Sequence, residues 1–275
     1  MKKWYMIAGM MIAAVFSTQA TVIEFSANEG YTAGDLNGQN NWYETAAGTF
    51  SVNTNSSGSV SIDSLGTVYK KAVYQQLLAP TQGEGASVGA ALSFSRNTTK
   101  GASGAVTYFA LDFTDTADYS TSANRVAVQL QRTDSGWRLQ FAEELGTDTN
   151  YDNADIADES LLGFSTENAD SDELWLQMTL YRGANDSSWT ASCTLSNMIT
   201  GQIVSSIDSG PFDLTSDFSD GVYAAMNKCL SNWSAGVTDR TVESFEVSVV
   251  PEPTTVSMFF VSSLGLILFR HIVTK

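Results

Sequence analysis

The chain is poor in positive charge and in the side chains that common catalytic mechanisms use. Its 275 residues include one histidine, His271, and two cysteines, which leaves little for histidine-based catalysis. Lysines and arginines number 14 against 30 aspartates and glutamates, a formal net charge of -16. Proteins that bind nucleic acid need a basic face for the phosphates, so this balance argues against nucleic acid as a partner.

The rest of the composition is typical of a folded protein. Hydrophobic residues make up 43% of the chain and aromatic residues 11%, too much for a disordered protein. The length suffices for one large domain or two modest ones, with an ample core in either case.

The first 20 residues have the pattern of a secretory signal peptide. Lys2 and Lys3 precede an apolar run over residues 4–16, and the small residue Ala20 stands at a suitable cleavage position. The run is shorter than the roughly 20 residues that span a bilayer, which favours a cleavable signal over a membrane helix. We therefore expect residues 1–20 to direct export and cleavage to follow Ala20.

Residues 250–275 form a second distinct segment. The triplet Pro251, Glu252 and Pro253 comes first, an apolar stretch covers residues 256–269, and Arg270, His271 and Lys275 close the chain. Two prolines so close together end sheet pairing. The apolar stretch predicts a short membrane anchor, and the positive charges after it favour the cytoplasmic side.

This tail resembles a PEP-CTERM sorting signal, which occurs on exported proteins of bacteria that make extracellular polysaccharide. The resemblance implies an exosortase that recognises Pro251, Glu252 and Pro253, removes the anchor after transient insertion in the inner membrane, and leaves the protein in the cell envelope or outside the cell. The chain departs from the family pattern because the usual arginine cluster is reduced to Arg270 and His271.

Between these ends, residues 21–249 have the pattern of an all-β domain. Short alternating runs lie between clusters of glycine, asparagine, aspartate and serine, which predict strands and turns. We expect strands at residues 22–25, 68–74, 87–94, 105–113, 125–132, 137–142, 174–181, 188–195, 202–207, 221–226 and 241–249.

These runs are apolar on one face. Val126, Val128 and Leu130 share one face of a predicted strand, and Gln129 and Gln131 share the other. Such strands indicate antiparallel sheets with one packed face and one face in water. About a dozen of them fit a single two-sheet antiparallel sandwich of the jelly-roll type.

The first and last predicted strands carry a second resemblance. Residues 25–42, with Glu-Gly-Tyr at 29–31, Gly-Asp-Leu at 34–36 and Gly-Gln at 38–39, resemble the opening of laminin-G and concanavalin A-like jelly rolls. Residues 242–247 resemble the closing strand, which such folds pair near the first one. The resemblance implies this fold but no single activity, because the architecture carries lectins, adhesins, lyases and hydrolases.

An acidic stretch at residues 143–173 contains 11 acidic residues and no basic residue. Asp148, Asn150, Asp152 and Glu159 stand at the first, third, fifth and twelfth positions of a calcium-loop spacing, which supplies the hard oxygen ligands that calcium prefers. The loop glycine is replaced by Asn153. Two interpretations follow: a calcium site, or a solvated insertion between strands.

Aromatic residues on one predicted strand suggest carbohydrate binding. Trp175, Gln177 and Tyr181 alternate with leucine and methionine, so they share the face opposite the core. Flat rings on a wet sheet face stack on sugars, and Gln177 supplies hydrogen bonds. The alternative is that these rings pack beneath a second layer or a loop.

The sequence gives less support for catalysis than for carbohydrate binding. The Glu-x-Asp-x-x-Glu pattern of concanavalin-like hydrolases is absent, and Glu143 and Glu144 are adjacent, so they face opposite sides of a strand. A lyase without histidine would depend on residues such as Tyr108 or Arg182.

The two cysteines, Cys193 and Cys229, both lie in the exported part, where a disulfide could form and persist. The alternative is two buried free thiols.

The sequence therefore predicts an exported bacterial surface or matrix protein that binds carbohydrate or contributes structure to an extracellular polysaccharide matrix without catalysis. The alternative is a glycan-active enzyme, a hydrolase or lyase, on the same fold.

Overall fold

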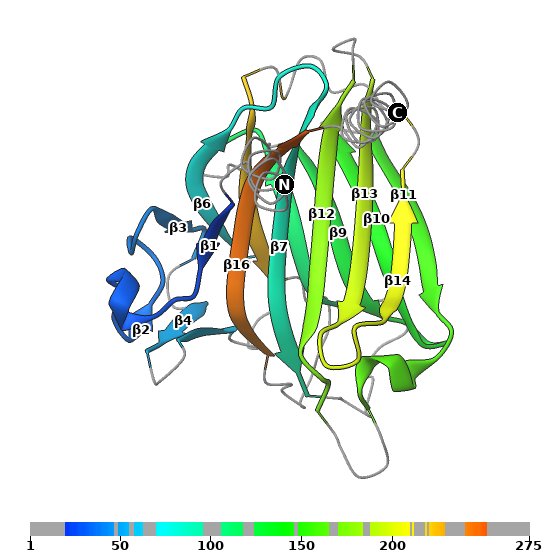
Figure 1. The fold of residues 1–275 in the computed structure, drawn as a ribbon, viewed down its shortest axis with the longest axis horizontal. Coiled ribbons are helices and arrows are strands. Elements are labelled where there is room, and N and C mark those ends of the chain that lie inside the picture. Colours follow the sequence, from blue (N-terminus) through cyan, green and yellow to red (C-terminus); the bar gives the residue numbers. More distant parts are fainter. Residues whose placement is uncertain are drawn as a thin grey trace, which may run out of the picture.

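The computed structural model is a sandwich of two antiparallel sheets (Figure 1). It describes residues 20–46, 49–54, 58–62, 70–95, 106–117, 124–145, 148–164, 170–183, 188–209, 211, 218, 220–228 and 240–251. The helices within these residues are two short 3-10 turns, η1 (Ala27–Glu29) and η2 (Glu159–Leu162). The predicted all-β, two-sheet architecture is confirmed.

The larger sheet has nine strands in the order β14-β13-β12-β7-β16-β5-β4-β2, and β1 also pairs with β16. Its strands are β1 (Thr21–Ile23), β2 (Gly34–Asp35), β4 (Phe50–Asn53), β5 (Ser59–Ile62), β7 (Glu84–Phe94), β12 (Leu174–Arg182), β13 (Trp189–Asn197), β14 (Ile203–Asp208) and β16 (Arg240–Pro251). The first and last strands lie side by side, with Ile23 opposite Phe245, as the resemblance to jelly rolls predicts.

The smaller sheet has seven strands in the order β11-β10-β9-β8-β15-β6-β3. They are β3 (Trp42–Glu44), β6 (Lys70–Leu78), β8 (Val106–Thr114), β9 (Arg125–Arg132), β10 (Trp137–Leu145), β11 (Asp148–Ile156) and β15 (Val222–Lys228). In Figure 1 this sheet lies behind the larger one, and the two sheets enclose the core between them.

The core forms because each strand turns alternate apolar side chains toward the other sheet. In β12, Leu174, Leu176, Met178 and Leu180 are all fully buried. Aromatic rings form two groups within this core. One group is Phe25, Tyr31, Trp42, Tyr74 and Phe245; the other is Phe94, Tyr108, Trp137 and Phe164.

The two predicted address segments lie almost wholly outside the described residues. The signal peptide at 1–20 meets the described chain only at Ala20, and the tail at 250–275 only at its first two residues. No helix in the described part of the chain is long and apolar enough to cross a bilayer. The anchor expected at residues 256–269 and the motif residues Glu252, Pro253 and Arg270 therefore stay predictions.

Strand β3 carries a buried acidic residue, Glu44. Glu44 of β3 is 4% exposed, and its Oε2 accepts a hydrogen bond from the backbone of Thr49 at 3.2 Å. Burial, and then the neighbouring Asp35 carboxylate, raise the pKa of Glu44 to about 8. Because the folded state keeps a proton that the unfolded chain releases near the ordinary value of 4.5, Glu44 lowers stability as pH rises between about 4.5 and 8.

Glu44→Gln removes this titration. We expect the stability of the variant relative to the native protein to increase from pH 5 to pH 8, by at least about 1 kcal/mol over the interval. Urea unfolding at several pH values measures it, with the exposed Glu24→Gln as a control for the lost charge. A difference that stays constant with pH would contradict the assignment.

Candidate functional site

The outer face of the nine-stranded sheet brings the predicted aromatic residues together. Trp175, Gln177 and Tyr181 are partly exposed on β12, on the side away from the buried leucines of that strand. β12 is flanked by β7 and β13 in antiparallel register. The three side chains therefore lie within the face of the sheet, between two flanking strands.

Two glycines of β7 let the rings lie directly on the sheet. A Cβ atom at Gly89 would stand 2.3 Å from Cζ2 of Trp175, and one at Gly85 would stand 2.8 Å from Cδ1 of Tyr181. Real side chains do not approach so closely, so any larger residue at either position would push a ring away. Each ring thus lies against the bare backbone of β7.

Hydrogen bonds connect the polar groups between the rings. The indole Nε1 of Trp175 donates to Oε1 of Gln177 at 3.4 Å, and Nε2 of Gln177 donates to Oγ of Ser87 at 3.0 Å. Oγ of Ser87 lies 3.1 Å from Oγ1 of Thr179. This chain of contacts fixes the rotamer of Gln177 and ties β12 to β7.

A row of hydroxyl groups continues the face on β13. Thr190, Ser192, Thr194 and Ser196 pair directly with the four outward positions of β12, and all four are partly exposed. Aromatic rings and hydroxyl groups in one plane can stack on the apolar faces of sugar rings and hydrogen-bond to their hydroxyls.

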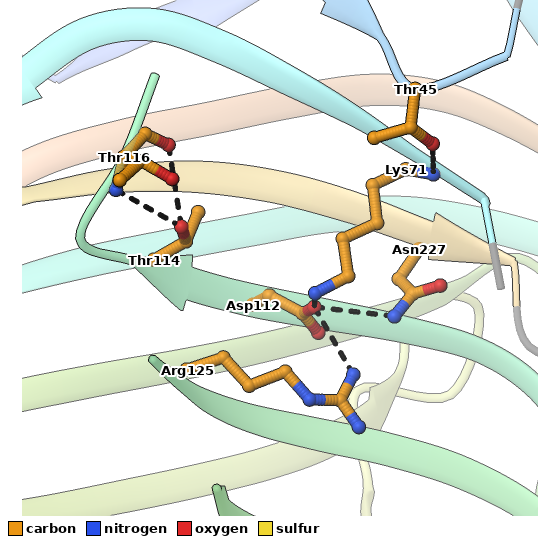
Figure 2. A network of polar contacts seen from close by, with 7 residues as sticks. All are labelled: Thr45, Lys71, Asp112, Thr114, Thr116, Arg125 and Asn227. Carbon is orange, nitrogen blue, oxygen red and sulfur yellow. Dashed lines mark hydrogen bonds and ion pairs between the residues drawn. The ribbon is translucent and has the colours of Figure 1, made fainter. Parts of the chain in front are cut away.

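A second polar cluster lies on the outer face of the seven-stranded sheet (Figure 2). Oδ2 of Asp112 on β8 is 2.6 Å from Nζ of Lys71, 3.4 Å from Nη1 of Arg125 and 3.2 Å from Nδ2 of Asn227. These side chains come from β6, β9 and β15, and all four residues are at most 2% exposed. The backbone N–H of Lys71 also donates to Oγ1 of Thr45 at 3.0 Å.

The prediction that the polar face of β9 lies in water is wrong. Gln129 and Gln131 are 4% and 5% exposed. Their amides join a hydrogen-bonded row in which Oγ1 of Thr107 donates to Gln129 at 2.7 Å, and Gln131 donates to Gln140 at 2.7 Å. Polar side chains tolerate this burial because they satisfy one another.

The Asp112 cluster does not provide the proton donor of a glycosidase. Burial alone would raise the pKa of Asp112, but the adjacent charges of Lys71 and Arg125 lower it below its usual range. The carboxylate therefore stays ionised, whereas glycoside hydrolysis needs one carboxylic acid held protonated opposite a second carboxylate. The two residues considered for a lyase, Tyr108 and Arg182, have different surroundings. Tyr108 is buried against Trp137, and Nη1 of Arg182 donates to the backbone oxygen of Pro80 at 3.2 Å.

The four predicted calcium ligands do not form a loop. Asp148, Asn150 and Asp152 lie on β11, an edge strand that pairs along its whole length with β10. Four strand residues span about 13 Å, so Asp148 and Asp152 stand too far apart to share one ion. Glu159 lies in η2 and accepts a hydrogen bond from Nη1 of Arg132 at 2.6 Å. The predicted twelve-residue calcium loop is therefore not formed at residues 148–159.

No group of three or more histidine, cysteine, aspartate or glutamate residues in the described segments is arranged to hold a metal. Calcium binding in general stays an untested expectation. Cys193 is a fully buried free thiol, and Cys229 lies outside the described residues.

Several residues of these faces escape prediction from the sequence. Gly85 and Gly89 matter only because β7 pairs with β12, which is nearly ninety residues further along the chain. The cluster partners Lys71, Asp112 and Asn227 are likewise far apart in sequence. The available signal is a lone charge within an apolar strand run, as at Asp112, which indicates a buried ion pair but does not name the partner.

The sequence matches no protein-family model and no curated protein sequence. Its fold is similar to several solved structures. Arcelin-5, a lectin-like defence protein from Phaseolus vulgaris, is 12% identical, with a TM-score of 0.52, over 84% of this chain and 99% of that one. Lectin II from Ulex europaeus is 13% identical, with a TM-score of 0.51, over 84% and 98%.

An endo-1,3-beta-glucanase from Streptomyces sioyaensis has a TM-score of 0.53 at 12% identity, over 84% of this chain and 95% of that one. At such identity these likenesses establish the fold alone, a concanavalin-like sandwich. The same fold carries both lectins and a glucanase in these neighbours, so the fold does not decide between binding and cleavage.

Asp112→Asn leaves the charges of Lys71 and Arg125 buried without a counter-charge. We expect it to lower the free energy of unfolding by about 3 kcal/mol or more. Glu159→Gln is the matched control, because it breaks the Arg132–Glu159 pair, whose side chains are 24% and 29% exposed, and should cost less than about 1 kcal/mol. Equal losses of unfolding free energy in the two variants, measured by urea unfolding, would show that burial adds nothing to the stabilisation by the Asp112 cluster.

Proposed function

We propose that the protein is an exported bacterial surface or matrix protein that binds carbohydrate, without cleaving it, on the outer face of the nine-stranded sheet. The carrying observation is the pair of partly exposed rings, Trp175 and Tyr181, that lie on Gly89 and Gly85. A ring already held against the backbone of a neighbouring strand loses little freedom when a sugar stacks on it, so little of the binding energy is spent on ordering it.

The polar groups around the rings support the same proposal. Gln177 is oriented by Ser87 at 3.0 Å, so its position is set before any ligand arrives. The hydroxyl row of β13 lies alongside. Serine and threonine hydroxyls both donate and accept hydrogen bonds, which matches the hydroxyls of sugars.

Export and sorting belong to the proposal as well. The proposed cleavage position, Ala20, immediately precedes β1, and Pro251 is the last residue of β16. A signal peptide ending at Ala20 and a sorting motif over Pro251, Glu252 and Pro253 would therefore flank the sandwich without interrupting it. The proposed partners are an exosortase-type enzyme, extracellular polysaccharide and, transiently, the inner membrane.

Trp175→Ala tests the binding site. We expect a loss of glycan affinity of at least about tenfold, equivalent to about 1.4 kcal/mol, because the stacking ring is gone. Binding of the purified full-length protein to a glycan array, followed by calorimetry on the selected glycans, measures it. Tyr43→Ala, which removes an exposed ring from the other sheet, should leave the affinity unchanged. No binding to any glycan by the folded protein would favour a purely structural matrix role instead.

Processing is tested by intact mass. In a bacterium that carries an exosortase, the mature chain should begin at Thr21 and lack residues 256–269. In the same strain without the enzyme it should keep them. A chain that retains these residues in both strains would contradict sorting through the tail.

A further inference from the structure

The outer face of the nine-stranded sheet carries no positive charge at its described positions. Strand pairing and the buried side chains define which residues point outward. The charged residues at these outward positions are acidic: Glu246 on β16, opposite Gly89, and Asp208 on β14, opposite Ser192. The remaining outward positions are glycine, small hydroxyl residues, amides, aromatic rings and a few aliphatic side chains.

This charge pattern selects against anionic ligands. Recognition of carboxylates, sulfates or phosphates uses arginine and lysine. Here a charged sugar stacked on Trp175 would instead lie beside the strand position of Glu246, within a chain of net charge -16. The face therefore suits an uncharged glycan, whose hydroxyls can donate to the carboxylates and bond with the serines and threonines.

The distance between the two rings favours a ligand of several sugar units. Trp175 lies over Gly89 and Tyr181 over Gly85, four residues apart on β7. Strand geometry places these two glycines about 13 Å apart. A single sugar covers one aromatic ring, so only an extended chain contacts both. The partly exposed Gln177, held by the buried hydroxyl of Ser87, lies between the rings, where the middle of such a chain would pass.

We infer that the ligand is an uncharged linear oligosaccharide segment that lies along β12 and β7, with different sugar units on Trp175 and Tyr181. The inference rests on the proposed carbohydrate-binding function and refines it. A terminal single sugar would need one ring only, and an acidic polysaccharide would need basic partners that the described face lacks. Both become outcomes of the test.

The test uses calorimetry on the full-length protein with neutral linear glucans, in β-1,3, β-1,4 and α-1,4 series, from disaccharide to hexasaccharide. Uronic acid oligosaccharides of the same lengths form the charged arm. We expect affinity for the preferred neutral series to rise at least tenfold from disaccharide to hexasaccharide, and the charged series to bind at least tenfold more weakly. Affinity that levels off at the disaccharide, or that favours the charged series, would overturn the inference.

Two variants locate the effect. Tyr181→Ala should remove the gain with length and leave disaccharide affinity near the native value. Gly89→Ala keeps both rings but forces Trp175 off the sheet, and should weaken every length; Ser93→Ala, outward on the same strand, is the control. Thermal unfolding verifies that each variant is folded. If Gly89→Ala does not fold, Tyr181→Ala alone tests the inference.

The failures of the two proposals differ. Glycan binding that Trp175→Ala abolishes, but that does not depend on length, would leave the proposed function standing and reject this inference. Absence of binding to every glucan and uronate, together with silence on the array, would reject both.

Discussion

The antiparallel pairing of β7 with β12 is the contact on which the proposed site depends. It sets Gly89 opposite Gln177 and Gly85 opposite Tyr181, so the bare backbone of one strand receives the rings of the other. The same register turns Leu176 and Met178 inward, where they are fully buried. One pairing thus builds the core on one side and the ring platform on the other. A slip by one residue would exchange the two faces and lose both.

The opposite sheet uses its outer face differently. Asp112 there holds Lys71 and Arg125 in a fully buried cluster, and a row of amides continues the polar face beyond it. Such a network tolerates little change, because removing one member leaves the others buried and unpaired. The partly exposed face with its flat rings and hydroxyls is therefore better suited to ligand exchange than the buried ionic one.

Local patterns in the sequence were enough for the architecture and part of the site. Strand β9 has the predicted bounds, and the outward placement of Trp175 and Tyr181 follows from alternation alone. Burial of Gln129 and the strand conformation at Asp148 were beyond such patterns. The first depends on hydrogen bonds between distant strands. The second is an acidic edge strand, whose charges protect the edge from further pairing but resemble a solvated loop in sequence.

The account is tested most directly by the indole N–H resonances of the full-length protein in NMR, titrated with a neutral glucan hexasaccharide. Trp175→Phe assigns the relevant peak. Trp42, Trp137 and Trp189 are buried and serve as internal references. The Trp175 resonance should shift with saturation, while the resonances of these three should not. A folded protein that binds the glucan with the Trp175 resonance unmoved would show that the site lies elsewhere.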